Sequence, residues 1–296
     1  NLNFLKFENE MQIKDKTIGL IEISHITKIT VKNSTFYTSP KTTIHLYNVR
    51  HIVLEESSFT KCIGEFAGAI LIAKDRVKSI QEQYISILEC QFMECRSMTG
   101  GGAITILDHY EKIKLHSKNV IKHGIHKVPM DNLIDMLKQH IEIDITKCHF
   151  WKCISKENGG AINLKLQNKN KLSLSVKMKM SETTIKNCLS QEGGGSISFT
   201  DKTNVGTITI VLANNSFQNN SAKFGGAIFA EKVKRLTGKN CTFLSNYATR
   251  YGGVLYLNYG LKCNIVHCKF IHNFCNTKVY NFYLDIHVNG GQGGVM

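Results

Sequence analysis

The stretch Asn215-Ser-Phe-Gln-Asn-Asn-Ser-Ala-Lys-Phe-Gly-Gly-Ala-Ile228 contains the two signals that decide the fold. The first is an aromatic residue followed three positions later by asparagine (Phe217 and Asn220), and the second is Gly225-Gly-Ala-Ile228. The aromatic position recurs eight times, once as isoleucine: Phe36, Phe59, Phe92, Phe150, Ile185, Phe217, Phe243 and Phe270. Eight copies in one frame indicate a repeat protein.

Each copy carries the same flanking pattern. Apolar residues stand seven and five positions before the aromatic, as in Ile29/Val31 and Ile210/Leu212, with one lapse to glycine at Gly238, and this is the period of a strand with one buried face. The residue two positions before the aromatic is small or polar and breaks this alternation, which predicts a bend between two strands. These residues are Ser34, Ser57, Cys90, Cys148, Thr183, Asn215, Cys241 and Cys268.

A second small or polar position follows the aromatic by three residues and holds Ser39, Cys62, Cys95, Cys153, Cys188, Asn220, Asn246 and Asn273. Six copies then reach a glycine signal, which predicts a tight corner with close backbone approach and a further strand. The six signals are Ala67-Gly-Ala-Ile70, Gly101-Gly-Ala-Ile104, Gly159-Gly-Ala-Ile162, Gly194-Gly-Ser-Ile197, Gly225-Gly-Ala-Ile228 and Gly252-Gly-Val-Leu255.

The repeat length favours a solenoid. The aromatic positions lie between 23 residues (Phe36 to Phe59) and 58 residues (Phe92 to Phe150) apart. Each interval holds two or three short strands and no hairpin signal, whereas propeller blades need four antiparallel strands in about 40–45 residues. The sequence therefore predicts an all-β fold, a single-stranded right-handed parallel β-helix (β-solenoid) of about eight coils, stacked about 4.8 Å apart.

The chain is expected to form one β-solenoid domain over residues 1–296. It begins at Asn1 and ends where a new Gly-Gly-hydrophobic signal starts, which favours a fragment of a longer chain. The long interval before Phe150 predicts a lateral insertion at 109–140 with a short amphipathic helix from Val128 to His140. No run approaches the roughly 18 apolar residues of a membrane span.

Composition excludes several classes of protein. Hydrophobic residues make up 42% of the chain, which excludes wholesale disorder, and two prolines exclude collagen-like and proline-rich chains. Lysine and arginine exceed aspartate and glutamate by 37 to 23, which gives a net charge of +14. The basic residues are spread along the chain without a nucleic-acid-binding module. A solvated lysine-rich exterior explains this charge, and binding of glycans or an acidic polysaccharide is the alternative.

The Phe-x-x-Asn and Gly-Gly-Ala-Ile signals resemble the repeats of the polymorphic outer membrane proteins of chlamydiae, within the pectin-lyase-like β-helix superfamily. The matching residues are Phe217–Asn220, Phe243–Asn246 and Phe270–Asn273, with the glycine signals at 101, 159 and 225. The resemblance spans residues 29–270 and implies an extracellular or cell-surface solenoid of the secretory pathway. It implies a structural or adhesive role and brings no catalytic residue and no cofactor. Cysteine replaces the family's asparagine in the first half of this chain.

Eight of the ten cysteines occupy the two small or polar positions. Stacked coils place equivalent Cα atoms within disulfide range, so the candidate disulfides are Cys62–Cys95, Cys153–Cys188, Cys90–Cys148 and Cys241–Cys268. Pairing within a coil competes, because a Cys-x4-Cys spacing recurs at 90/95, 148/153 and 263/268. A stack of free, buried thiols is the other alternative. The spacings do not fit structural zinc, and no metal ligands are predicted.

Four N-x-Ser/Thr sequons begin at Asn33, Asn214, Asn219 and Asn240. Three of these asparagines stand three positions before the aromatic, at the predicted bend, and should be exposed. Together with the cysteine content, they favour a secreted glycoprotein with these four asparagines as glycosylation sites.

The acidic residues are scattered, and Asp144, between Ile143 and Ile145, should point outward and alone. A glycoside hydrolase needs two carboxylates in one cleft, and a lyase needs acidic and basic residues on one strand face. We therefore expect no enzyme, with a carbohydrate-active β-helix lyase or hydrolase as the alternative. Solenoid ends expose strand edges, which predicts end-to-end stacking on other copies or on further segments of the chain, and such stacking would form a filament.

Overall fold

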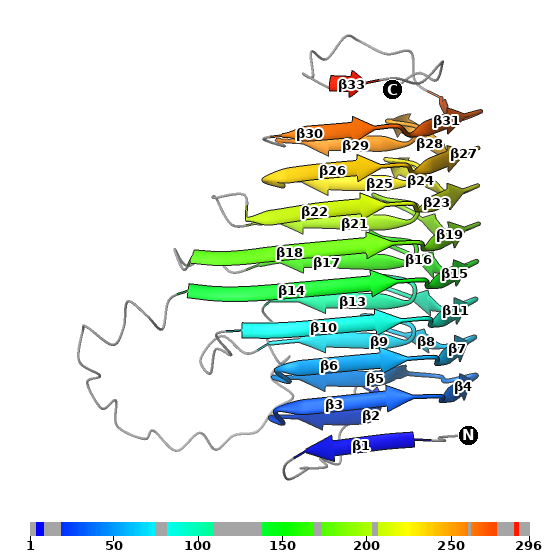
Figure 1. The fold of residues 1–296 in the computed structure, drawn as a ribbon. Coiled ribbons are helices and arrows are strands. Elements are labelled where there is room, and N and C mark those ends of the chain that lie inside the picture. The colour runs from blue at the N-terminus through cyan, green and yellow to red at the C-terminus, as the bar shows by residue number, and fades with distance from the viewer. Residues whose placement is uncertain are drawn as a thin grey trace, which may run out of the picture.

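The computed structural model describes residues 4–8, 19–74, 82–108, 138–167, 173–202, 207–259, 262–276 and 287–289. The chain winds into a right-handed parallel β-helix, as the sequence predicts (Figure 1). A full coil has four strands, one in each of four sheets that we name A, C, D and B in the order in which the chain visits them, so the prediction of two or three strands was too low.

Sheet A is the broadest. Its strands are β1 (Phe4–Glu8), β3 (Lys28–Lys32), β6 (His51–Glu55), β10 (Glu82–Leu88), β14 (Lys138–Thr146), β18 (Ser173–Ser181), β22 (Ile208–Ala213), β26 (Arg235–Lys239), β30 (Cys263–Val266) and β33 (His287–Asn289). Sheet C holds β4 (Thr35–Tyr37), β7 (Ser58–Thr60), β11 (Gln91–Met93), β15 (His149–Trp151), β19 (Thr184–Lys186), β23 (Ser216–Gln218), β27 (Thr242–Leu244) and β31 (Lys269–Ile271).

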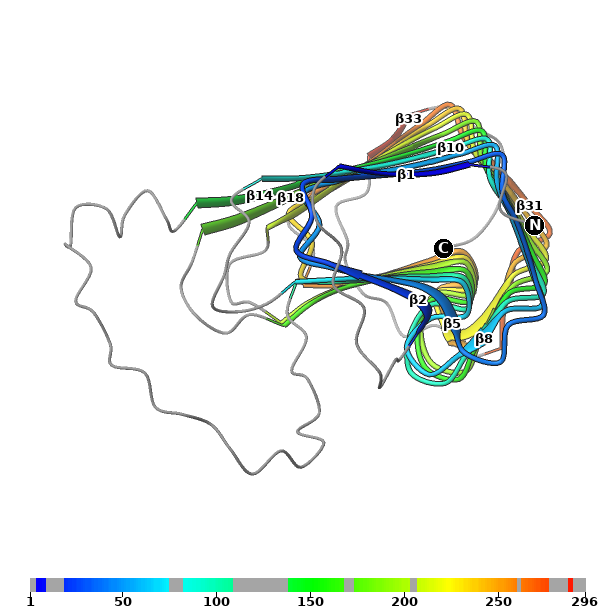
Figure 2. The ribbon, with the colours of Figure 1, turned by 90° about the horizontal axis from the view of Figure 1, so that it is seen from below.

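Sheet D is the narrowest and holds β8 (Ile63–Gly64), β12 (Arg96–Ser97), β16 (Ile154–Ser155), β20 (Leu189–Ser190), β24 (Ser221–Phe224), β28 (Tyr247–Tyr251) and β32 (Phe274–Cys275). Sheet B holds β2 (Gly19–Ser24), β5 (Thr42–Tyr47), β9 (Ile70–Ala73), β13 (Ile104–Leu107), β17 (Ile162–Leu166), β21 (Ile197–Asp201), β25 (Ile228–Glu231) and β29 (Leu255–Asn258). Figure 2, seen down the axis on which the coils stack, shows the sheets superposed from coil to coil.

The register follows the frame that the sequence predicts. Phe92 pairs with Phe59 on one side and with Phe150 on the other, so equivalent residues form columns along the solenoid. All strand pairs are parallel except that of β1, which runs antiparallel to β3 at the N-terminal edge of sheet A. That antiparallel pair differs from the prediction, but it joins strands that are not consecutive in the chain and forms no hairpin.

The aromatic column forms the predicted stack inside the solenoid. Neighbouring rings are stacked at centroid distances of 4.7 Å for Phe36 and Phe59 and 4.9 Å for Phe217 and Phe243. All the predicted members of this column are buried except Phe270, which is half-buried in the last coil with this frame. Equivalent side chains of successive coils therefore bury one another, which is how a repeat of short strands gains a continuous core.

The glycine signals act as predicted. The first glycine of four signals has a positive φ of 62–72°, which disfavours residues with a Cβ. The second glycine allows close backbone approach, because a Cβ on Gly226 would overlap the carbonyl oxygen of Gly253 in the next coil.

The predicted insertion falls largely outside the described residues. Its last three residues, 138–140, belong to strand β14 and not to a helix, because they pair with β18 in the parallel ladder. This corrects the predicted end of the insertion. Within the part of the chain that the structure describes, no helix is long and apolar enough to cross a membrane.

Candidate functional site

Each coil turns from sheet A into sheet C at an exposed residue with a left-handed backbone, three positions before the aromatic position. The φ angles of these residues are 47–55°. The residues are Asn33, Glu56, Glu89, Lys147, Glu182, Asn214, Asn240 and His267. This is the bend that the break in alternation predicts. Asparagine tolerates this conformation better than most residues, so the corner suits the three sequon asparagines found there.

All four sequon asparagines are exposed at corners. Asn219 differs from the other three because it lies at the turn from sheet C to sheet D, with a φ of 51°. The Asn240 side-chain amide donates to Oδ1 of Asn214 at 3.3 Å, so these two asparagines are side by side in adjacent coils. The predicted exposure of Asn33, Asn214 and Asn240 is confirmed. Glycosylation of all four asparagines stays a prediction.

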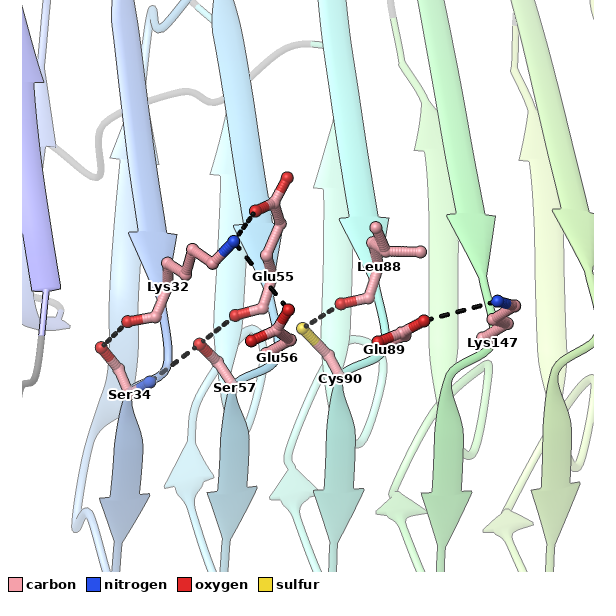
Figure 3. Close-up of polar contacts among 9 residues, drawn as sticks. All are labelled: Lys32, Ser34, Glu55, Glu56, Ser57, Leu88, Glu89, Cys90 and Lys147. Atoms are coloured by element: carbon pink, nitrogen blue, oxygen red, sulfur yellow. Dashed lines mark hydrogen bonds and ion pairs between the residues drawn. The ribbon is translucent and has the colours of Figure 1, made fainter.

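Surface ion pairs link adjacent coils beside this corner (Figure 3). Lys32 Nζ lies 3.1 Å from Glu55 and 3.9 Å from Glu56, and Lys147 Nζ lies 3.5 Å from Glu89. The hydrogen bond with Glu55 raises the pKa of Lys32. Exposed ion pairs of this kind contribute little to stability, so they indicate a solvated exterior and do not by themselves mark a binding site.

The buried residues two positions before the aromatic form one column, which we name the first column. Its side chains accept hydrogen bonds from the backbone amides of the equivalent residues in the preceding coil. Ser34 N donates to Ser57 Oγ at 3.1 Å (Figure 3), and Thr183 N donates to Asn215 Oδ1 at 3.0 Å. The column thus satisfies backbone donors that the bend removes from the sheets.

The buried residues three positions after the aromatic form the second column. In its asparagine part, Asn220 and Asn246 each donate through Nδ2 to the aromatic-position carbonyl of the preceding coil, at 3.0 Å. In its cysteine part, the thiols of Cys95 and Cys153 lie 3.5 Å from the equivalent carbonyl oxygens. The thiols therefore replace asparagine as weak donors to the same backbone groups.

The structure brings together the two members of each predicted disulfide. Each pair occupies adjacent positions of one column, and Cys241 N lies 3.3 Å from Cys268 Sγ. The two members of a competing Cys-x4-Cys pair lie in different columns. Cys90 and Cys148 are in the first column, and Cys95 and Cys153 are in the second. All ten cysteines are free thiols in the structure, and nine are buried. The disulfides stay predictions.

Most of these thiols are held protonated. Burial raises the pKa of Cys90 to about 11 and that of Cys148 to about 12, and contact with Cys95 raises the pKa of Cys62. Cys268 differs, because the hydrogen bond from Cys241 lowers its pKa to about 7, while the same contact raises the pKa of Cys241. Since the thiolate is the reactive form, we expect Cys268 to react more readily than Cys90 and Cys148, whose pKa values are raised.

The outer face of sheet A corrects one prediction. Asp144 is exposed as expected but not alone, because Glu142 precedes it by two residues on the same face of β14. Lys179 Nζ on β18 lies 3.0 Å from Glu142. The hydrogen bond to Lys179 lowers the pKa of Glu142, and the same contact raises that of Lys179. Both shifts favour the charged forms, which suits binding better than proton transfer.

Among the residues that the structure describes, no group of three or more His, Cys, Asp or Glu is positioned to hold a metal ion. The five histidines at 109–140 include four that lie outside those residues, and the fifth, His140, belongs to β14.

One segment of the chain matches a known family of repeats. Residues 216–231 match the Chlamydia polymorphic membrane protein repeat. The matched segment runs from β23 through β24 to β25, so it contains Phe217-x-x-Asn220, the glycine corner and the strand that follows. No curated protein and no solved structure gives a significant match to the chain. The repeat that the sequence resembles is thus present in one coil, and the other coils share its frame.

Proposed function

We propose that this chain is a non-enzymatic extracellular or cell-surface β-helix with a structural or adhesive role. The observation that carries the proposal is the match of one coil to a repeat of polymorphic membrane proteins, in a chain whose coils all share that frame. The exposed sequon asparagines at left-handed corners support a passage through the secretory pathway.

Labelling of intact cells that produce the protein tests this localisation. An antibody against the folded chain should stain unpermeabilised cells or detect the protein in the medium, and added protease should remove the surface signal. Staining only after permeabilisation would contradict the proposal. Beads coated with the purified chain should adhere to cells or to extracellular matrix more than beads coated with a boiled sample.

End-to-end stacking is part of the proposal. In the described part of the chain, β29, β31 and β32 are the last strands of sheets B, C and D, so their outer edges face along the solenoid axis (Figure 1). A parallel edge can pair with another copy by extending the ladder. Sedimentation velocity over increasing concentrations should show growing oligomers, and electron microscopy should show rods of increasing length. A constant monomer would contradict this assembly.

A carbohydrate-active enzyme is the second candidate, and one observation favours it. Glu142 and Asp144 on β14 face Lys177 and Lys179 on β18, which gives acidic and basic groups on one exposed strand face. Incubation with polygalacturonate, with chain cleavage measured by viscosity and by unsaturated product, tests this candidate. The proposal expects no cleavage. Cleavage that disappears in Glu142→Gln would establish the enzyme instead.

A further inference from the structure

The outer face of sheet A carries opposite charges on two neighbouring central strands. Glu142 and Asp144 lie on β14, and their partners in the register of β18 are Lys177 and Lys179. Asp144 is exposed and the other three side chains are half-buried. Sheet A forms one broad side of the solenoid, and no strand that the structure describes lies over its outer face (Figure 2). This pattern of charge is therefore open to a partner.

The ion pairs within one copy leave these charges incompletely matched. The ammonium groups of Lys177 and Lys179 share one carboxylate, because they lie 3.9 Å and 3.0 Å from the same oxygen, Oε1 of Glu142. Asp144 accepts a hydrogen bond from Thr146 Oγ1 at 2.9 Å and forms no ion pair with a described residue. One ammonium group is thus in surplus, and one carboxylate is left for a cation from outside.

A two-fold axis that runs along the strands, midway between β14 and β18, makes this face complementary to itself. When a second copy is laid face to face about this axis, its β18 lies opposite β14, and its β14 lies opposite β18. Lys177 of one copy then faces Glu142 of the other, and Lys179 faces Asp144. Symmetric dimers form through one self-complementary surface of this kind, and opposite charges fix its register.

The charges also select the orientation of the second copy. The other two-fold axis in the plane of the contact runs along the solenoid and would place β14 opposite β14. Glu142 would then face Asp144 of the other copy, and Lys177 would face Lys179, so that like charges meet throughout. Only the axis along the strands brings opposite charges together, and it makes the two solenoid axes antiparallel.

The rest of the face is compatible with this contact. The same axis brings β6 opposite β26, where Glu55 meets Lys239 at one level of the register. Small, half-buried side chains surround the charged centre and let two sheets approach to about 10 Å. These residues are Ser86, Thr146, Ser181, Thr209, Val211 and Ala213. Lys28 meets Lys262, which precedes β30, as a like charge, but at the rim of the face, where salt solution screens both.

The face is large enough for a stable dimer. Its strands from β3 to β30, about 4.8 Å apart and about six residues long, cover a plane of about 750 Å². A standard interface buries about 800 Å² per partner. The net charge of +14 repels two copies. Salt at physiological ionic strength screens charges more than about 8 Å apart, whereas the facing groups of the contact would lie closer.

We propose that two copies of this chain dimerise through the outer face of sheet A, with β14 of each copy opposite β18 of the other. This contact is lateral and closes at two copies, so it goes beyond the end-to-end stacking proposed above, which has no such limit.

Charge reversal tests the contact between copies. Glu142→Lys with Asp144→Lys makes the face basic, and Lys177→Glu with Lys179→Glu makes it acidic. In sedimentation velocity at about 0.15 M salt, the wild-type chain should form a dimer. Each variant alone should be monomeric, with the dissociation constant raised more than about a hundredfold by the facing like charges. An equimolar mixture should form a one-to-one heterodimer, because an acidic face then meets a basic one, and this rescue also shows that both variants are folded.

Lys152→Glu with Lys186→Glu is the matched control, because it changes the net charge as much as the acidic variant does but lies on the side of sheet C. It should dimerise like the wild type. A wild-type chain that stays monomeric, homodimers of both reversed variants, or a mixture without heterodimer would each overturn the inference. Oligomers that grow steadily with concentration, in the wild type and the reversed variants alike, would also overturn it and leave end-to-end stacking as the assembly.

Discussion

The backbone amide of Cys188 donates to Oδ1 of Asn220 at 2.9 Å, at the point where the second column changes from cysteine to asparagine. On the other side of this junction, the Asn220 side-chain amide donates to Oδ1 of Asn246 at 3.0 Å, and Asn246 Nδ2 donates to Oδ1 of Asn273 at 2.9 Å. The second column can thus hold either cysteine or asparagine. Both side chains offer a hydrogen-bond partner to buried backbone groups of the preceding coil, which would otherwise have none.

Replacing Asn246 should therefore destabilise the solenoid. Asn246→Ala leaves the amide of Asn220 and the carbonyl of Phe217 buried without these partners. The expected loss is about 2–4 kcal/mol in the free energy of unfolding, measured by urea denaturation. Asn246→Cys is the matched variant and should lose less, since a thiol occupies this position in earlier coils. Equal losses for the two variants would contradict a role for the thiols as hydrogen-bond donors.

The glycine corner predicts a pair of contrasting variants. In Gly226→Ala the new Cβ would meet only backbone, including Tyr247 N at 2.7 Å, so the coils must separate locally. We expect a loss of about 3 kcal/mol or more in unfolding free energy. In Gly238→Ala the atom nearest to the new Cβ is the flexible Cδ1 of Ile265 at 2.9 Å. The free energy of unfolding should therefore change by less than about 1 kcal/mol. Similar losses at both glycines would argue against close backbone approach at the corner.

The buried lysine Lys74 predicts a pH dependence. Its side chain is 2% exposed, its Nζ has no hydrogen-bond partner among the described residues, and burial lowers its pKa to about 8 from 10.5. Between pH 8 and pH 10.5 the Lys74 amine is largely neutral in the folded chain and still protonated in the unfolded chain. The free-energy cost of burying Lys74 therefore falls as pH rises from about 8 to 10.5.

Lys74→Met isolates this effect from the ionisation of the thiols. The variant should be more stable than the wild type at pH 7, and its advantage should shrink by about 3 kcal/mol by pH 10.5. Chemical denaturation of both proteins across this range measures the difference. An advantage that does not change with pH would show that Lys74 keeps its ordinary pKa.

Oxidation should begin at Cys241 and Cys268. Cys241 and Cys268 are adjacent in the first column, and the hydrogen bond from Cys241 lowers the pKa of Cys268 to about 7, so we expect part of this thiol to ionise at neutral pH. Under mild oxidant, non-reducing peptide maps should show this disulfide first, with a rate that rises as pH passes about 7. Cys90 and Cys148 are the internal control, because their raised pKa values should delay their disulfide. Earlier oxidation of the control pair would contradict this order.

Expression in a eukaryotic secretory system tests the sequons. Glycans should be found by mass spectrometry on Asn33, Asn214, Asn219 or Asn240, because all four are exposed at corners. Thr35→Ala and Thr242→Ala each remove a sequon without disturbing the left-handed asparagine, so they should remove the glycan and keep the melting temperature. Four unmodified asparagines in the secreted protein would contradict the prediction.

The sequence by itself determined the coil and its frame. Each coil has to repeat the same apolar, small and glycine residues, because equivalent positions stack in columns. The fold could therefore be recognised from Phe217, Asn220 and the glycine signal. The exposure of Asn33 could be predicted from its place at the bend. The narrow sheet D escaped prediction, because two-residue strands such as Ile63–Gly64 leave no periodic signal.

Only the tertiary structure decided which side chains of adjacent coils are neighbours. Glu142 forms its ion pair with Lys179 on the next strand, 37 residues later in the chain, and the pKa of Cys268 is lowered by its contact with Cys241 in the preceding coil. Stacking sets these neighbours through the register of parallel strands, and a single coil does not contain that information.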